Sequence, residues 1–403
     1  MSRDAWITGL AAVTALSSDF ETFADRLLAG QSGIRHVDLL GRWGESPCAV
    51  GIVDDVPRPD GWSPESFQPL NRLDRFASSC TVRALQDAAL WEDRQQLRVG
   101  VVLGLGAERF HVWEIEKAHG SGCVYDPQQE PQPTLRRIQQ HLGLTGPGMT
   151  VAAACASGNY ALGIARGWVT SGLVDVCLAG SFDVVTGLAF VGFNNLRALS
   201  RSSGPPEAAS RPFDVDRDGF VMSEGGAMFV VESARHARVR GAKAYGALAG
   251  FGASSDASHM IIPSQDPQPA SQAMRRALAD AELQPHEVDY LNAHATSTPV
   301  GDRAEVNALR SVYGDALSSL PVSATKSITG HALSGAASIE ALACLVALRR
   351  QMLPPTLNLE NPDPECDLNH VVHKSRPHRV QVAASNSFGF GGSNTCLVLR
   401  KAA

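Results

Sequence analysis

Cys155 is the residue in this sequence whose setting is best suited to chemistry. A short apolar run from Val151 to Ala154 leads into it, and apolar residues then recur every three to four positions from 160 to 169, which predicts a helix. At a helix N-terminus the unpaired N–H groups and the helix dipole favour a thiolate, so we expect the pKa of Cys155 to lie below its usual value of roughly 8.5. The sequence therefore predicts a cysteine nucleophile, with a buried structural cysteine as the alternative.

Two histidines have contexts that suit partners of this thiol. His294 and His331 each follow a β-rich run and lie in turns of small residues, so both are expected at strand ends, where they can reach one site. A thiolate nucleophile needs a base or cation nearby and groups that stabilise developing charge. Lys326 lies five residues before His331 and Glu340 nine residues after it. We expect this pair to form a buried ion pair that orients the imidazole, the alternative being a surface lysine and a glutamate on a helix face.

Two other patterns resemble metal sites but lack a necessary feature. Acidic residues at 214, 216 and 218 are spaced like the first half of a calcium loop, but Gly225 stands where that motif needs its glutamate. Cys366, His370, His373 and His378 suggest a zinc site, but the HxxH spacing in a polar strand or loop does not place both histidines on one face. We therefore expect no metal.

The composition is typical of a globular protein and excludes several functional classes. The chain has 403 residues, 44% of them hydrophobic and 19% charged, which suggests two or three domains with a large core. A net charge of -6 gives no reason to expect a nucleic-acid partner. Since no apolar run approaches the ~18 residues of a membrane span and the N-terminus lacks signal-peptide features, we expect a cytoplasmic protein with no membrane partner. Eight cysteines without a CxxC pair suit free thiols in a reducing compartment.

The remaining pattern predicts alternating strands and helices that hold these residues. Strands are expected at 5–10, 98–104, 174–180, 227–232, 244–251, 288–293, 320–323, 380–385 and 395–399, and helices at 20–29, 73–90, 236–240 and 270–281. Residues 35–70 are rich in Pro and Gly and are predicted to be loop, and Asp302 with Glu305 is predicted to cap a helix as a capping box. Because the strand, turn and helix order recurs, we expect a duplicated α/β unit with halves at 1–243 and 244–403.

Four segments in a fixed order form a recognisable set. They are ACASG at 154–158, HATSTPVGD at 294–302, KSITGH at 326–331 and NSFGFGGSN at 386–394. Together they resemble the signatures of the elongating β-ketoacyl-acyl-carrier-protein synthases, and SRPFDVDRDGFVMSEGG, SSDASHM and LPPTLNLENPDPECDL extend the resemblance over essentially the whole chain. The resemblance implies a thiolase fold, with two βαβαβαββ halves stacked in five αβαβα layers, normally as a homodimer.

The same resemblance implies a decarboxylative Claisen condensation. Cys155 would take an acyl group from an acyl carrier protein, with the oxyanion held by the backbone N–H groups of Cys155 and Phe390. His294 and His331 would promote loss of CO2 from malonyl-carrier protein and stabilise the enolate, and Lys326 with Glu340 would support the site. No cofactor of its own is expected, because the 4'-phosphopantetheine is carried by the partner.

The resemblance also implies residues that bind substrate and carrier protein. Thr296 and Thr298 would bond the pantetheine arm, and the acyl pocket and its gate would be formed by Phe193, Ala107, Phe388 and Phe390. Ala107 stands where a bulky aliphatic residue is usual, which predicts room for a long or bulky acyl chain. The basic docking patch is thin, with Arg72, Arg75 and Arg197 as its members, and this suggests a dedicated carrier protein or a different docking face.

Several alternatives stay open at this level. The pathway is either fatty-acid synthesis or a specialised polyketide or polyene pathway. Two alternative hypotheses are a subunit of a ketosynthase heterodimer and a non-decarboxylating acyltransferase on the same fold. Phe390 stands where a thiolase has a second cysteine, and His331 where initiating synthases have asparagine, so neither of those classes fits.

Overall fold

One eleven-stranded sheet runs through the computed structural model, which describes residues 5–39, 48–106, 113 and 133–402. Its strands, from one edge to the other, are β12 (Asn369–His370), β10 (Pro321–Ser323), β9 (Tyr290–Asn292), β14 (Val382–Gly389), β15 (Ser393–Arg400), β8 (Gly246–Ser255), β1 (Ala5–Thr14), β7 (Gly225–Ser233), β6 (Val176–Asp183), β4 (Val99–Leu105) and β5 (Gly148–Val151).

The sheet contains the same arrangement twice. The first half contributes β1, β4, β5, β6 and β7, and the second contributes β8, β9, β10, β14 and β15. If the five strands of each half are numbered in chain order, their spatial order from the outer edge to the junction is 3-2-4-5-1 in both halves. In the second half, β12 is added beyond β10. The halves join where β1 pairs with β8 in antiparallel register. The predicted duplication is therefore confirmed.

Helices connect the strands of each half in the order βαβαβαββ. They are α1 (Phe20–Leu28), α2 (Pro64–Phe67), α3 (Arg72–Asp87), α5 (Thr134–Leu142), α6 (Ser157–Thr170), α7 (Gly187–Asn195), α8 (Ala234–Val239), α9 (Gln268–Asp280), α10 (Pro299–Tyr313), α11 (Lys326–Thr329) and α12 (Ala336–Arg350). None of the described helices is both long and apolar enough to cross a membrane.

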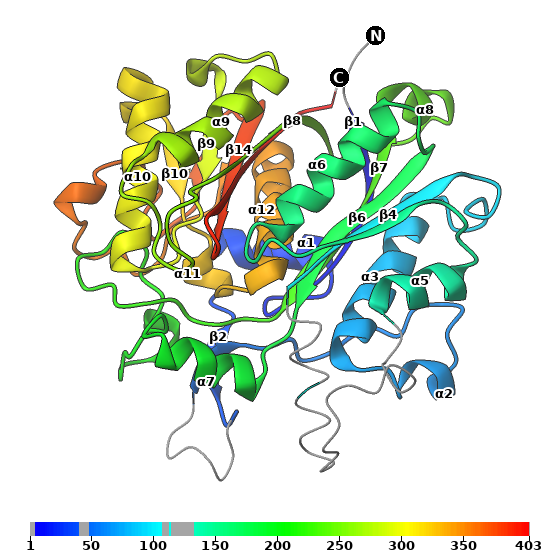
Figure 1. Cartoon of the computed structure of the whole chain (residues 1–403), viewed down its shortest axis with the longest axis horizontal. Coiled ribbons are helices and arrows are strands. Elements are labelled where there is room, and N and C mark those ends of the chain that lie inside the picture. The colour runs from blue at the N-terminus through cyan, green and yellow to red at the C-terminus, as the bar shows by residue number, and fades with distance from the viewer. Residues whose placement is uncertain (1–4, 40–47, 107–112, 114–132, 403) are drawn as a thin grey trace.

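The two halves of the sheet lie on opposite sides of α6 and α12, so the elements stack in five layers, as expected (Figure 1). Helices α3 and α5 cover the first half's strands on one outer side, and α9 and α10 cover the second half's strands on the other. Helices α6 and α12 lie between the two halves and pack on strands of both. Three large hydrophobic clusters fill the spaces between layers, the central one built around α6 and α12.

The amino-acid composition of helix α12 explains its buried position between the two halves. Apart from Glu340 and the two arginines at its end, its residues are apolar or small all round, which is typical of a helix buried on every side. All residues from Ala336 to Leu348 are buried, and only Arg349 and Arg350 at its end reach solvent. Interior strands of the sheet, such as β1, β4 and β6, are likewise buried on both faces.

The prediction of loop for residues 35–70 is wrong in part. Residues Ile34–Val37 (β2) and Cys48–Gly51 (β3) pair as an antiparallel two-stranded sheet, and α2 begins at Pro64 with Ser63 as its N-cap. A second small sheet, not predicted either, joins Met352–Leu353 (β11) and Arg376–Pro377 (β13). These strands of two to four residues are too short to produce a readable alternation.

Candidate active site

Cys155 lies in a tight turn between β5 and α6, two residues before the helix begins at Ser157. Ala154 has φ of 48°, a left-handed conformation that is strained for a residue with a side chain. Ser157 Oγ accepts the N–H of Ala153 at 3.0 Å and donates to the carbonyl of Ala154 at 2.6 Å. Ser387 of the second half donates to the carbonyl of Cys155 at 2.8 Å. The turn is therefore fixed from both halves of the molecule.

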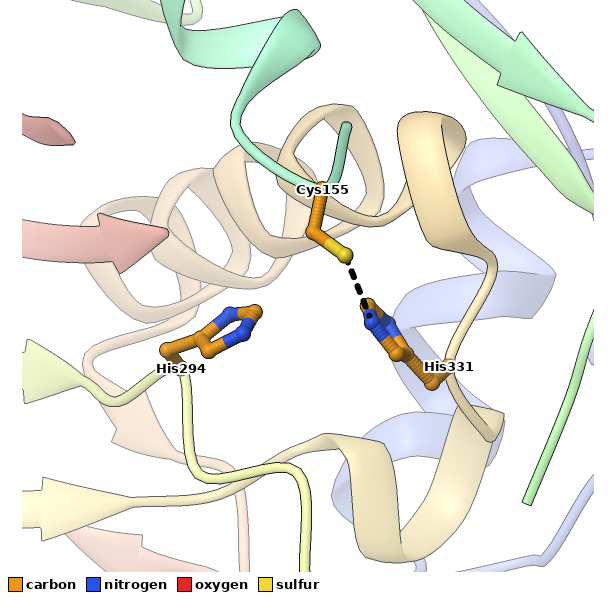
Figure 2. A group of neighbouring side chains, drawn as sticks. All are labelled: Cys155, His294 and His331. Carbon is orange, nitrogen blue, oxygen red and sulfur yellow. Dashed lines mark hydrogen bonds between the residues drawn. The ribbon is translucent and has the colours of Figure 1, made fainter. Parts of the chain in front are cut away.

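His331 is the direct partner of the thiol. Its Nε2 lies 3.0 Å from Sγ of Cys155 (Figure 2). Its backbone is held by the first half, because its N–H donates to the carbonyl of Val221 at 2.8 Å and its carbonyl accepts from Ser223 at 2.9 Å. Nδ1 of His331 is buried and has no hydrogen-bond partner among the described residues. No neighbour fixes the tautomer, so Nε2 can act as acceptor or as donor.

His294 lies opposite His331, directly after the strand β9 (Figure 2). The two imidazole centroids are 5.5 Å apart and nearly perpendicular. Lys326 Nζ donates to Nδ1 of His294 at 3.3 Å, to the carbonyl of His294 at 2.6 Å, and to Glu340. All three ammonium donors are used, and a bonded Nδ1 places the proton of a neutral His294 on Nε2. The predicted ion pair of Lys326 and Glu340 is present and buried.

The expected lowering of the Cys155 pKa is wrong. Burial raises the pKa of Cys155 to about 12, and the cation of Lys326 opposes this shift only in part. Burial also holds the pKa values of His294 and His331 well below 6.5, with Lys326 acting in the same direction. The helix dipole acts within the first turn, whereas Cys155 lies outside it and is only 9% exposed. The resting pair is therefore a neutral thiol that donates to a neutral imidazole.

Glu305 and Asp302 have a role that the sequence analysis missed. Helix α10 has no capping box: Thr298 is its N-cap and makes no side-chain capping bond. Instead Glu305 accepts the backbone N–H groups of His294 and Ala295 at 3.0 and 2.8 Å. Asp302 accepts the N–H of Ser297 at 3.1 Å. The signal available in the sequence was the pair Asp302 and Glu305, two acidic residues one helical turn apart in the helix that follows the turn carrying His294.

The proposed oxyanion donors lie close together. Among the described residues, the backbone N–H groups of Cys155 and Phe390 donate to no other residue. A Cβ placed on Gly389 would lie 3.2 Å from the nitrogen of Cys155 and 2.6 Å from the carbonyl oxygen of Ala153. Only glycine permits this approach, so the loop after β14 can present its N–H beside that of Cys155.

A cavity of about 220 Å³ opens onto the three side chains. Its lining includes Ala189, Phe193, Phe220, Leu333 and, as polar members, Asp183 and Ser334. It also includes Thr296, Thr298, Gly301, Phe388 and Phe390. The predicted pocket residues are thus brought together, except Ala107, which lies outside the described residues.

Local contacts explain two of these placements. The hydroxyl oxygens of Thr296 and Thr298 are 3.1 Å apart, and Gly301 leaves them room, since a Cβ there would meet Thr298 Oγ1 at 2.4 Å. The rings of Phe193 and Phe390, which both line the cavity, lie 6.0 Å apart.

The three arginines expected to form a docking patch differ in availability. The guanidinium of Arg72 is bonded to the buried carboxylate of Glu224 and to the carbonyl of Val53. Arg75 is half-buried, and its Nε is buried without a hydrogen-bond partner among the described residues. Arg197, two residues beyond α7, is exposed. Of the three, only Arg197 is an exposed residue, whereas Arg72 and Arg75 are partly buried.

The sequence patterns that resembled metal sites are structural. Asp214 accepts the backbone N–H groups of Asp216, Glu360 and Asn361, each at 2.8 or 2.9 Å. Within the described chain, the residues Cys366, His370, His373 and His378 do not converge as ligands. The donor atoms that do lie within 4.8 Å of one another are those of Cys155, His294 and His331.

A duplicated five-layer fold, with a cysteine at the start of a central helix and two imidazoles facing it, defines a condensing enzyme of the thiolase fold with a Cys–His–His site. The comparisons with known proteins are consistent with this class. Residues 2–237 match "Beta-ketoacyl synthase, N-terminal domain", and residues 245–360 match "Beta-ketoacyl synthase, C-terminal domain". The chain belongs to the beta-ketoacyl synthase family.

Individual relatives cover the whole length of the chain. It is 36% identical to a 3-oxoacyl-[acyl-carrier-protein] synthase 2 of Synechocystis sp., over 98% of this chain and 97% of that one. It is 34% identical to the protein of the same name from Vibrio harveyi, over 98% of each. A solved beta-ketoacyl synthase from Burkholderia phymatum has a TM-score of 0.90 and 31% identity over 100% of both chains. A type II polyketide ketosynthase in complex with its acyl-carrier protein has a TM-score of 0.88 and 29% identity, also over 100% of both.

Proposed function

We propose that this enzyme condenses a Cys155-bound acyl group with malonyl-carrier protein, giving a β-ketoacyl chain two carbons longer. The observation that carries the proposal is the arrangement of one thiol and two imidazoles around one cavity, with Sγ of Cys155 3.0 Å from Nε2 of His331. The names of the relatives support the same reaction, in fatty-acid or type II polyketide-like chain elongation.

The first step is acylation of Cys155. The thiol passes its proton to Nε2 of His331 as the sulfur attacks the thioester carbonyl of the acyl donor. The oxyanion that forms is stabilised by the N–H groups of Cys155 and Phe390, each typically worth ~3 kcal/mol. The C–S bond to pantetheine then breaks, and the proton on His331 leaves with the pantetheine thiol.

The second step is decarboxylation and condensation. Nε2–H of His294, with the proton placed there by Lys326, donates to the thioester carbonyl of the malonyl group, and His331 donates as its Nε2–H tautomer. The bond to the carboxylate breaks, CO2 leaves, and the electron pair forms an enolate held by both imidazoles. The enolate carbon attacks the acyl thioester, the new C–C bond forms, and the C–S bond to Cys155 breaks. The thiolate released takes up one proton from solvent, which the overall reaction consumes, and Cys155 returns to the neutral thiol beside His331.

An acyl carrier protein delivers both substrates, with Thr296 and Thr298 bonding the pantetheine arm. The structural neighbour in complex with its carrier supports this partner. A homodimer is part of the proposal, and the open edge at β5 supports it. A cytoplasmic location and the absence of a resident metal or cofactor stay predictions.

The test is the intact mass of the purified protein after incubation with acyl-carrier proteins of graded chain length and then with malonyl-carrier protein. We expect an acyl adduct on the wild type, none on Cys155→Ala, and discharge of the adduct with a two-carbon gain and release of CO2. An adduct that malonyl-carrier protein leaves in place would mean a non-decarboxylating acyltransferase.

A second candidate is the catalytic subunit of a heterodimer. It is favoured by the solved ketosynthase from Xenorhabdus doucetiae, which forms a complex with a chain length factor and has a TM-score of 0.82 and 27% identity over 99% of this chain and 98% of that one. In that case the chain alone gives no adduct, and adding the partner subunit restores it.

A further inference from the structure

Two loops carry residues that line the cavity and also reach the surface, such as Ile262 and Phe390, and we call this part of the cavity its mouth. One joins β8 to α9 and contributes Asp256, Ile261 and Ile262 to the cavity lining; the other joins β14 to β15 and contributes Phe390. The N–H of Gly391 donates to the carbonyl of Met260 at 2.7 Å, so Met260 lies beside the second loop.

Further contacts make this mouth rigid. The N–H of Asp256 donates to Gly392 at 2.8 Å, and its carboxylate accepts from Asn394 at 2.6 Å. Nδ1 of His259 accepts the N–H groups of Ile261 and Ile262, both at 3.0 Å. The residues between 259 and 262 therefore have one fixed conformation.

The rim of this mouth exposes large apolar side chains. Met260 is 74% exposed, Ile262 53% and Phe390 36%. Single exposed apolar residues are ordinary, but several together on a rigid surface mark a contact site. We call these three residues the apolar rim.

The charges around the mouth do not suit an acidic partner. Among the described residues that line the cavity there is no lysine or arginine, whereas Asp256 and Asp266, from the loop between β8 and α9, are both part of the lining. Arg197 lies four residues beyond Phe193, whose ring approaches that of Phe390, and is an exposed cation on this flank. Among the described residues named at this mouth, Arg197 is therefore the one cation that an acidic partner could pair with.

We propose that the carrier protein docks on the apolar rim by burying Met260, Ile262 and Phe390, and not by pairing its acids with a basic patch; this inference rests on the function proposed above. The partner it fits is a carrier whose surface beside the phosphopantetheine serine is apolar and carries few acids. Burial of apolar area then supplies the affinity, so docking should depend weakly on salt.

Met260 provides the decisive variants, because it is exposed and does not line the cavity. We would compare Met260→Lys and Met260→Glu, using as donor the octanoyl-loaded carrier that acylates the wild type fastest in a panel of bacterial carriers. Apolar docking predicts that both variants lower kcat/KM for this donor by about tenfold, since either charge must be desolvated. Val239, 83% exposed on α8, provides matched controls as Val239→Lys and Val239→Glu, which should match the wild type.

Octanoyl-N-acetylcysteamine, a thioester too small to need docking, separates this inference from the proposed function. If the wild type is not acylated by it or by any carrier, the proposed function fails. If octanoyl-N-acetylcysteamine acylates the wild type, four results would each overturn the docking inference. Two concern the carrier as donor: kcat/KM rises with Met260→Lys and falls with Met260→Glu, or it changes with neither variant. The other two are an equal loss of kcat/KM when the small thioester is the donor, and no acylation of the wild type by any carrier.

Discussion

The thiol of Cys155 and Nε2 of His331 share one proton across 3.0 Å, in surroundings that disfavour both charged forms. We expect no stable thiolate at neutral pH. The difference in absorbance at 240 nm between the wild type and Cys155→Ala should show no titration between pH 6 and 9, because burial raises the pKa of Cys155 to about 12. The other cysteines cancel in this difference. An inflection near or below the usual thiol pKa of roughly 8.5 would contradict the neutral pair.

The buried imidazole of His331 should make stability depend on pH. Its folded-state pKa is well below 6.5, so below pH 6.5 the unfolded state binds a proton that the folded state does not. This contribution to the free energy of unfolding is present above pH 6.5 and is lost as pH falls towards the folded pKa. Between pH 7.5 and 5.5 the wild type should lose about 1 kcal/mol more than His331→Asn, which lacks the group.

Urea denaturation at the two pH values measures this difference. His286→Asn, at an exposed position between α9 and β9, is the matched control and should follow the wild type. If His331→Asn and the wild type lose equal stability, the imidazole of His331 is not held neutral by its surroundings.

At the scale of elements, helix α10 holds the turn that carries His294. The carboxylate of Glu305 accepts two consecutive backbone N–H groups, and an amide there must turn a donor towards one of them. In Glu305→Gln we expect decarboxylation of malonyl-carrier protein to fall about tenfold, equivalent to about 1.4 kcal/mol. Acylation of Cys155 should change less than threefold, because the backbone of His331 is held separately by Val221 and Ser223, which precede β7.

Release of CO2 and formation of the acyl adduct, measured separately, give the two rates. Glu282→Gln, at an exposed position after α9, is the control and should leave both unchanged. Equal losses in both steps would mean that Glu305 supports the fold and does not specifically position His294.

The elements differ in how far the sequence could predict them. Helix α6 and the buried strands β4 and β6 were readable because their apolar patterns are local. The partners of Glu305 were not readable, because an acid after a turn has the same local pattern whether it caps its own helix or binds a neighbouring loop. The Cys155 pKa was missed for a related reason: helix position is local, whereas burial is set by residues from both halves.

The same distinction applies to the cations. The sequence does not distinguish Arg72 from Arg197 as docking residues. In the structure Arg72 is bonded to Glu224, which lies 152 positions away, whereas Arg197 is exposed. Similarly, the pair of Lys326 and Glu340 was predictable as a pair, but the use of all three ammonium donors, two of them on His294, is visible only in the folded second half, where the turn after β9 lies beside α11 and α12.

At the scale of the whole molecule, the sheet has two unequal edges. The edge strand β12 has two residues, whereas β5 has four, is mostly exposed, and presents Met149 at 42% exposure. An open apolar edge strand is a template for pairing with another chain. Two copies joined antiparallel at β5 would continue the sheet across a twofold axis and cover Met149 in each, as a closed dimer requires.

Met149→Glu should therefore dissociate the homodimer, because the negative charges on the two copies would repel each other across the paired edge. We expect sedimentation to show a dimer for the wild type and a dissociation constant at least tenfold higher for Met149→Glu, whereas Leu173→Glu, 51% exposed on the loop before β6, should stay dimeric. Because β5 leads directly into the strained turn at Ala154 and Cys155, the variant's rate of Cys155 acylation should also fall on dilution. A monomeric wild type with full acylation activity would show that the β5 edge is not a dimer contact and that one chain completes the site.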